Sequence, residues 1–372
     1  MKFKIERATL LRSLSHVQGI VERRNTIPIL SNVLLEARQG RVRLSATDLD
    51  LEIVELVKAD VFQEGGTTAP AHTLHDIVRK LPDGAEVELT LDAAEGRLTV
   101  RAGLARFQLA CLPREDFPAM TAGDLPNRFA LGPGELKRMI DKTRFAISSE
   151  DTRYYLNGIY LHVAEGDGEA RLRAVATDGH RLARYEIAAP AGAQGMPGVI
   201  VPRKVVGEIR KLADEAEGAI EVGVSDAKIR FAFDDIVLTS KLIDGTFPDY
   251  ARVIPAGNDR ELHVPAHELA QAVDRVATVS SERSRAVKLS LEEDRLTLSV
   301  TAPESGSATE ELEVGYRAPA LQIGFNARYL LDILTQIEGD KGLLLLADAG
   351  SPTIVRDEED DGALYVLMPM RV

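Results

Sequence analysis

The sequence predicts an α+β protein built from three similar domains, each with two helices packed on antiparallel sheets. Three observations lead to this prediction. A strand followed by a helical apolar pattern occurs three times, a second helical pattern follows each of these in phase, and two short words recur at one constant spacing. Between the helical patterns, apolar and polar residues alternate, which is typical of strands that bury one face.

The first part of each copy is a short alternating strand that leads into a helix. This pattern occurs at 3–17, 129–140 and 262–276, where Leu10, Leu136 and Leu269 occupy equivalent places. The second part is another helix, which is expected at 74–81 after Pro70, at 205–212 after Pro202 and at 329–334 after Asn326.

Identical words relate the first two copies. Ala-Thr-Asp occurs at 46–48 and 176–178, and Phe-Pro occurs at 117–118 and 247–248. In the third copy the counterpart of Ala-Thr-Asp is expected at 300–302, where the sequence has drifted to Val-Thr-Ala. Proline-containing links near 125–126 and 254–255 separate the copies, so the predicted domains are residues 1–126, 127–256 and 257–372.

Composition indicates a soluble globular protein. Hydrophobic residues make up 45% of the chain, and no apolar run is long enough to span a membrane. The start of the chain lacks the apolar stretch of a signal peptide. Cys111 is the single cysteine, so it cannot form an internal disulfide, and we expect it in the core. A reducing, cytoplasmic location is predicted.

The net charge of −13 argues against a simple basic nucleic-acid binder. Most of the acidic excess lies in the last third of the chain, which includes the run at 357–361. Cations instead recur on the predicted helices, at Arg24, Arg79-Lys80, Lys137-Arg138 and Arg203-Lys204. For a single helix, a solvated face explains such charges, but their repetition in two copies favours a shared role.

A polar cluster at Asp178-Gly179-His180-Arg181 raises the question of catalysis. It follows an apolar strand, so it is predicted to be a hairpin turn, and the equivalent word in the first copy has no histidine. Further tight turns joining strands are expected at 83–84, 95–96 and 244–245. A hydrolase that used Asp178 and His180 would need a nucleophile, and no motif supplies one. His72 and His75 have no partners with metal-ligand spacing, so no catalytic residue, metal or cofactor is predicted.

The chain end is the second unusual stretch. Its apolar run reads as a final strand through Leu367, which Met368, Pro369 and Met370 extend. Methionine adapts its shape and recurs on surfaces that accept varied partners. An apolar cleft lined by the chain end and the link around Phe247-Pro248 is therefore expected.

With these residues in view, the whole chain resembles the bacterial DNA polymerase III beta subunit family, the replicative sliding clamps. The most specific matching words are Ile27–Asn32, Arg153–Gly158, Ala176–Ala183, Val201–Lys204, Phe247–Tyr250 and Met368–Arg371. The resemblance implies three similar domains, a head-to-tail dimeric ring around duplex DNA, helices that line the hole, and no catalytic activity. A scaffold of three repeats is the remaining alternative, and it would not be retained on closed circular DNA.

The resemblance also implies a peptide-binding cleft, in which His180 and Arg181 donate hydrogen bonds while Leu182 and the methionines accept apolar side chains. Its residues are Arg153, Tyr155, Leu156, Thr177, Gly179, His180, Arg181, Leu182, Pro248, Arg252, Val253, Asn326, Tyr329, Met368, Pro369, Met370 and Arg371. The implied DNA-facing residues are Arg24, Arg79, Lys80, Lys137, Arg138, Lys142, Tyr154, Arg203 and Lys204.

The implied dimer interface joins a strand of the first domain to the end of a helix of the third. Its residues are Arg106, Phe107, Leu109, Thr278 and Val279, and Thr278 is smaller than the aliphatic residue that the family often has there. The partners implied are a second copy of the chain, double-stranded DNA without sequence specificity, the DNA polymerase III catalytic subunit, the clamp loader, and other polymerases and repair proteins that carry short clamp-binding peptides. No membrane partner is implied.

Overall fold

A computed structural model describes residues 1–121, 123–166, 168–280, 285–303 and 305–371. The chain forms two compact units, each assembled from several stretches of sequence. The first comprises Met1–Leu136, Pro190–Pro197 and Gly207–Leu242, and the second comprises Lys137–Ala189, Gly198–Val206 and Ile243–Val372.

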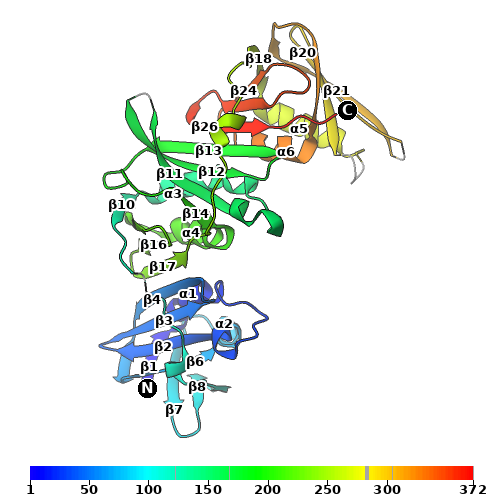
Figure 1. The fold of residues 1–372 in the computed structure, drawn as a ribbon. Helices are drawn as coiled ribbons and strands as arrows, with labels where there is room; N and C mark the ends of the chain where they lie inside the picture. Colours follow the sequence, from blue (N-terminus) through cyan, green and yellow to red (C-terminus); the bar gives the residue numbers. More distant parts are fainter. Residues whose placement is uncertain (122, 167, 281–284, 304, 372) are drawn as a thin grey trace. The chain divides into compact units, whose positions relative to one another are not determined.

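Two antiparallel sheets form the framework of the first unit (Figure 1). The smaller has the strand order β5 (Asp60–Gln63), β1 (Lys2–Glu6), β7 (Glu86–Asp92), β8 (Arg97–Ala102) and β9 (Ala105–Ala110). The larger has the order β10 (Asn127–Leu131), β15 (Ile220–Val224), β16 (Lys228–Phe233), β17 (Ile236–Lys241), β4 (Leu51–Lys58), β3 (Arg41–Thr47), β2 (Asn32–Arg38) and β6 (Gly65–Pro70).

The second unit also has two antiparallel sheets. The larger has the order β14 (Val199–Pro202), β11 (Gly158–Gly166), β12 (Glu169–Thr177), β13 (Arg181–Ala188), β26 (Asp360–Leu367), β25 (Thr353–Asp357), β24 (Lys341–Leu346), β18 (Arg260–Pro265) and β22 (Gly315–Tyr316). The smaller has the order β21 (Gly306–Glu313), β20 (Arg295–Ala302), β19 (Ala286–Glu292) and β23 (Leu321–Asn326).

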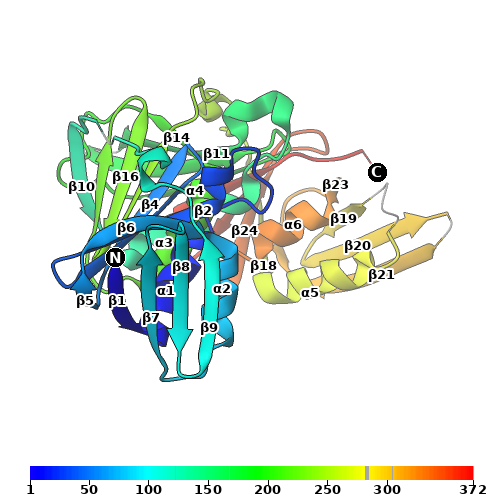
Figure 2. The same ribbon diagram turned by 90° about the horizontal axis from the view of Figure 1, so that it is seen from below.

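The helices predicted from the apolar pattern are all present. They are α1 (Arg7–Gln18), α2 (Ala71–Lys80), α3 (Pro133–Asp141), α4 (Arg203–Glu215), α5 (Ala266–Ala277) and α6 (Ala327–Leu334). The residues that set the helical period, such as Leu10, Leu269 and Leu330, are fully buried. Helices α1 and α2 pack on each other in the first unit, as α5 and α6 do in the second (Figure 2). No helix in the described ranges is long and apolar enough to cross a membrane.

Neighbouring copies of the repeat share sheets, which the sequence pattern did not predict. In the first unit β17 pairs with β4, which places Leu238 opposite Ile53. In the second unit β13 pairs with β26, which places Leu182 opposite Val366. All four side chains are buried, so each sheet carries its apolar face across the junction of two copies.

The tight turns follow the prediction only in part. Gly96 lies in the hairpin between β7 and β8, and Gly179 lies in the hairpin between β12 and β13, as expected. The prediction that two other turns join strands is wrong. Residues 83–84 connect helix α2 to β7, and residues 244–245 lie in the link after β17. An acidic residue followed by glycine favours a turn, but it does not determine which elements the turn connects.

Candidate functional site

The turn between β12 and β13 is held rigidly by its own side chains. The Asp178 carboxylate accepts hydrogen bonds from the backbone N–H groups of His180 (2.9 Å) and Arg181 (3.0 Å). The Thr177 hydroxyl donates to the Arg181 carbonyl (2.7 Å) and accepts from the Gly179 N–H (3.1 Å). Gly179 has φ of +86°, and a Cβ there would lie 2.5 Å from Nη1 of Arg153. The positive φ favours glycine in this turn, and the turn's own hydrogen bonds fix the place of His180.

Arg181 does not have the role that the sequence suggested. Its side chain is buried and donates to Asp178 (3.2 Å), Asp332 (2.5 Å) and the Phe145 carbonyl (2.7 Å). The guanidinium carbon lies 4.4 Å from the centre of the Tyr329 ring. These contacts occupy the fork, so the prediction that Arg181 donates to a bound peptide is wrong. Arg181 instead holds the turn against helix α6.

Leu182 is also placed differently from the prediction. Its side chain is 2% exposed, so it is not available to accept apolar side chains of a peptide. It belongs to an apolar cluster that is formed by residues of the second and third copies of the repeat. The cluster contains Leu156, Val175, Leu182, Ile200, Phe247, Tyr250, Ile354, Leu364 and Val366, with Tyr155 packed against it.

The chain end runs beside the turn. The Met368 N–H donates to the His180 carbonyl (2.9 Å), and the Met370 N–H donates to the Gly324 carbonyl on β23 (2.8 Å). The strand therefore ends at Leu367, as predicted, and the residues beyond it are tied by their backbone. The side chains of Met368 and Met370 remain 40% and 37% exposed. Two large apolar side chains are thus held at the surface of the second unit.

The remaining predicted site residues lie in the same unit as these two segments. The His180 and Tyr329 rings lie 5.9 Å apart, and Asn326 caps helix α6 by accepting from the N–H groups of Arg328 and Tyr329. Val253 is 50% exposed on a short 3-10 turn, beside the buried Tyr250. We call this region the turn–tail surface, which comprises Thr177, Gly179, His180, Val253, Tyr329, Met368, Pro369 and Met370.

His162 has a structural role, and His180 has no catalytic partner among the described residues. His162 on β11 lies 2.9 Å from the Tyr250 hydroxyl. Burial lowers the pKa of His162, and the nearby Arg173 and Arg184 lower it further. Among the described residues, no hydroxyl or thiol is hydrogen-bonded to His180, and no group of three or more His, Cys, Asp or Glu could hold a metal ion. The described residues therefore contain no catalytic arrangement around this turn.

His72, His75 and Cys111 lie in ordinary structural surroundings in the first unit. Ring nitrogens of His72 contact Gln18 (3.1 Å) and the Val21 carbonyl (2.9 Å) on the neighbouring segment. His75 lies 3.3 Å from the Ser15 hydroxyl, so both histidines pack locally. Cys111 is half-buried rather than a full core residue.

The predicted DNA-facing cations fall into two groups. Arg24, Arg79, Lys80 and Arg203 are exposed, whereas Lys142 is 1% exposed. The Lys142 ammonium contacts the Gln336 carbonyl and lies 3.0 Å from Glu338. The prediction that Lys142 faces DNA is therefore wrong, because a buried lysine must keep its partners.

Arg138, one turn before Lys142 on α3, is also paired. It donates to Glu338 (2.9 Å) and to Asp360 (3.1 Å), although its side chain is 44% exposed. Arg138 on α3 and Lys142, which directly follows this helix, thus both serve contacts within the second unit.

The predicted interface residues lie on a free edge of the smaller sheet of the first unit and just after helix α5 in the second. Strand β9 is an edge strand, where Arg106 is exposed, Phe107 is 37% exposed and Leu109 is 8% exposed (Figure 2). Leu109 therefore offers little surface. In the second unit Thr278 is exposed and Val279 is half-buried, directly after helix α5.

Asp332 is the site residue that the sequence did not reveal. It lies in the apolar run of α6 and pairs with Arg181. A lone carboxylate between apolar helix positions was the available signal, since such a group needs a buried partner.

Paired helices on shared antiparallel sheets, repeated along the chain, define this protein as a DNA clamp. The family models of the DNA polymerase III beta subunit match in order: the N-terminal domain at residues 1–121, the central domain at 130–249 and the C-terminal domain at 251–371. The chain belongs to the DNA polymerase III beta subunit family.

Close relatives agree with this assignment over the full length. The beta sliding clamp of Caulobacter vibrioides is 55% identical over 372 residues, which is 100% of both chains. A crystal structure of the Caulobacter crescentus beta sliding clamp has a TM-score of 0.98, and the match covers 100% of this chain and 99% of that one at 55% identity. The Bartonella birtlesii sliding clamp bound to griselimycin has a TM-score of 0.97 at 51% identity, with 100% of both chains covered. Sliding clamps are non-catalytic processivity subunits in DNA replication, and this chain has that function.

Proposed function

We propose that the turn–tail surface binds short peptides of the DNA polymerase III catalytic subunit, the clamp loader, and other polymerases and repair proteins. The observation that carries this proposal is the pair of exposed methionines fixed beside the His180 turn. Apolar anchors of a peptide pack on Met368, Met370 and Val253, and His180 offers a polar contact at the rim. The Bartonella birtlesii relative is bound to griselimycin, which supports a ligand site in clamps of this kind.

The roles of the remaining cleft residues follow from their placement. Pro248, Arg252 and Arg371 are exposed and form the rim, whereas Tyr155 and Leu156 belong to the apolar base. Arg153 and Asn326 position the turn and helix α6, respectively. The peptide thus meets a few exposed side chains on a backbone that is already held by hydrogen bonds, which limits the entropy lost on binding.

The chain acts as a head-to-tail homodimer that forms a ring. Edge strands such as β9 and β21 are unpaired in the single chain and are ready to pair with another chain. Arg106 on β9 and Glu311 and Glu313 on β21 are exposed and have opposite charges. Glu310 is already paired with Arg275 of the same chain. Phe107 and Val279 supply the apolar part of the interface, and three domains per chain, at 1–126, 127–256 and 257–372, complete the ring.

The ring encloses duplex DNA in the cytoplasm without reading its sequence. Exposed cations face phosphates: Arg79 and Lys80 on α2, Arg203 on α4, and Arg24, which lies in a bend after α1 and not on the helix where the sequence placed it. Lys204 follows Arg203 on α4, whereas Lys137 lies on α3 and the exposed Tyr154 lies on the 3-10 turn Asp151–Leu156. Phosphate contacts alone allow sliding, since they carry no base specificity.

Retention on DNA tests encirclement. After its loader places the protein on a closed circular duplex, we expect it to remain until the circle is cut, and then to leave within the time needed to slide to an end. Binding to short linear duplex should be weak and should fall steeply with salt. Gel filtration of the loaded circles before and after cutting measures this. Equal loss from cut and uncut circles would contradict encirclement.

A further inference from the structure

A gap flanked by two arginines lies on the solvent-facing side of the larger sheet of the first unit. Gly223 on β15 pairs with Arg128 on β10 at one side and with Arg230 on β16 at the other. Because Gly223 has no side chain, nothing from its own strand fills the space between them. Their backbones are two strand spacings apart, about 9.6 Å, so both long side chains reach the gap.

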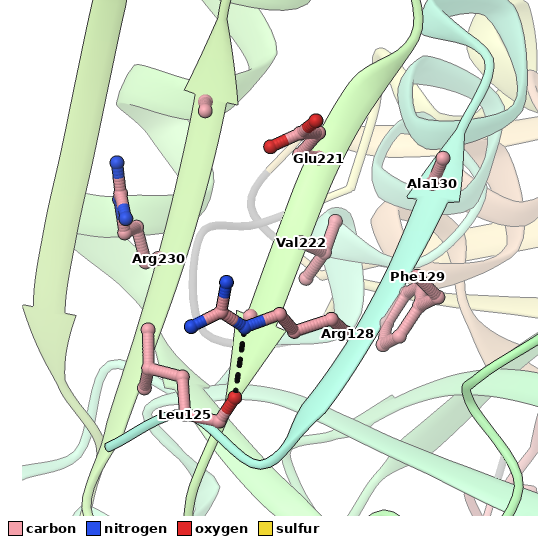
Figure 3. A pocket seen from close by; sticks show the side chains of 9 residues that line it. Leu125, Arg128, Phe129, Ala130, Glu221, Val222 and Arg230 are labelled. Carbon is pink, nitrogen blue, oxygen red and sulfur yellow. Dashed lines mark hydrogen bonds between the residues drawn. The ribbon is translucent and has the colours of Figure 1, made fainter. Parts of the chain in front are cut away.

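The gap has an apolar floor. Leu125 is 3% exposed and lies over Gly223, and a Cβ on Gly223 would be 3.0 Å from its Cδ1 atom. In the next cross-strand row, Glu221 stands between Ala130 and Ala232, whose small side chains leave that row open as well. The result is a pocket of about 300 Å³, which Figure 3 shows with Arg128, Arg230 and Glu221 around it. We call it the Gly223 notch.

Among the described residues, nothing bonds the terminal Nη groups of Arg128 and Arg230. Arg128 donates from Nε to the Leu125 carbonyl (3.2 Å), which orients its guanidinium and leaves both Nη groups unoccupied (Figure 3). Among the described residues, neither Arg128 nor Arg230 has a carboxylate within 4.0 Å, although Glu221 lies in the same pocket. Two unpaired guanidinium groups in a chain of net charge −13 are a local reversal of its overall sign.

We propose that the Gly223 notch binds an acidic peptide segment of a partner protein, with one carboxylate between Arg128 and Arg230 and an adjacent aliphatic side chain in the open row of Ala130 and Ala232. A guanidinium fork matches the planar geometry of a carboxylate. The apolar floor gives a place for a side chain, which a bare anion would leave empty. Glu221 repels ligands with dense charge, such as a row of DNA phosphates, and so favours a singly charged side chain.

The site can be tested with the full-length protein and a small probe. The probe is the capped tripeptide acetyl-Leu-Asp-Leu-amide, titrated while the methyl resonances of Leu125 and Val222 are followed by NMR. We expect these methyl groups to shift with saturation at millimolar concentration, and the fitted affinity to fall as salt is added. The matched peptide acetyl-Leu-Asn-Leu-amide, inorganic phosphate and a short DNA duplex are titrated in parallel and should bind at least severalfold more weakly.

Single substitutions test how much each charged residue contributes to binding of the aspartate peptide. Arg128→Gln and Arg230→Gln should each weaken the aspartate peptide about tenfold, whereas Glu221→Gln should strengthen it severalfold. Arg38→Gln, at an exposed position on β2 of the same sheet, is the matched control and should have no effect. Absence of shifts at Leu125, equal binding of the asparagine peptide, tighter binding of phosphate or duplex, or an equal loss in Arg38→Gln would each overturn the proposal.

Discussion

His16 on α1 lies between two carboxylates of the first unit. Its Nδ1 is 2.8 Å from Glu55 and its Nε2 is 3.2 Å from Glu215. Ser13 donates to Glu55 (2.7 Å) and Arg12 donates to Glu215 (2.8 Å), so both carboxylates are oriented. Burial lowers the pKa of His16, but the hydrogen bonds and charges of Glu55 and Glu215 outweigh burial and raise the pKa above 6.5. Both ring nitrogens can donate only in the imidazolium form.

This histidine should make stability depend on pH. Because its folded pKa is raised, its contribution is fully present below pH 6.5, the unfolded value, and is lost as pH rises through the folded pKa. We expect the wild type to unfold at a higher temperature than His16→Gln near pH 6, and the difference to shrink as pH rises through the folded pKa of His16. Scanning calorimetry of both proteins measures it. A difference that stays constant with pH would show that the imidazolium is not responsible.

Lys142 and Arg181 show where reasoning from single residues reaches its limit. The turn that contains Arg181 was predicted, because a glycine at positive φ and an Asx turn are local features. The partners of its guanidinium were not, since Asp332 lies 151 residues further along the chain. Lys142 likewise carries the charge expected of a DNA-facing helix, but its partner Glu338 comes from another copy of the repeat. Exposure is decided by tertiary contacts that no local pattern encodes.

At the scale of elements, the chain end acts through both its backbone and its side chains. Deleting residues 368–372 removes two exposed methionines and the hydrogen bonds to His180 and Gly324, while β26 remains complete. We expect the affinity for a peptide from the polymerase tail to fall at least tenfold, since each buried anchor is worth about 1–4 kcal/mol. Titration calorimetry measures the affinity, and the oligomeric state should be unchanged.

Two point variants separate these contributions. Replacing Met368 and Met370 with alanine keeps the backbone bonds, so a similar loss would assign the affinity to the side chains. His180→Ala should have a smaller effect, because a hydrogen bond at the rim contributes about 1 kcal/mol. If the truncated chain binds the peptide as tightly as the intact chain does, the turn–tail surface is not the peptide site.

The elements themselves were largely predictable, and the sheets were not. The helical period of the apolar residues predicted α1 to α6, because burial of one helix face fixes the spacing of those residues. Alternation gave the strands, and the copy number followed from the repeated words. The pairing of β17 with β4 and of β13 with β26 was missed, since a strand pattern shows which face is buried but not which edge finds a neighbour. The domains predicted from sequence therefore carried no information on shared sheets.

At the scale of the whole molecule, the proposed ring depends on association of two chains. A ring held on DNA by topology needs only weak phosphate contacts, which is consistent with a chain of net charge −13 whose exposed cations include helical arginines such as Arg79 and Arg203. The free energy of dimer association then determines how long the ring stays on DNA. The surface available for it combines the exposed Phe107 with Val279 at the end of α5.

The mass in solution tests this directly. We expect the wild type to have about twice the 40.5 kDa mass of one chain at micromolar concentration. Val279→Asp should produce monomers, because burial of an unpaired carboxylate against Phe107 costs several kcal/mol, roughly a hundredfold or more in dissociation constant. Thr73→Asp adds the same charge at an exposed position near the start of α2 and should leave the dimer intact. Sedimentation equilibrium distinguishes these states. A wild type that remains monomeric throughout the micromolar range would exclude the ring, and with it retention by encirclement.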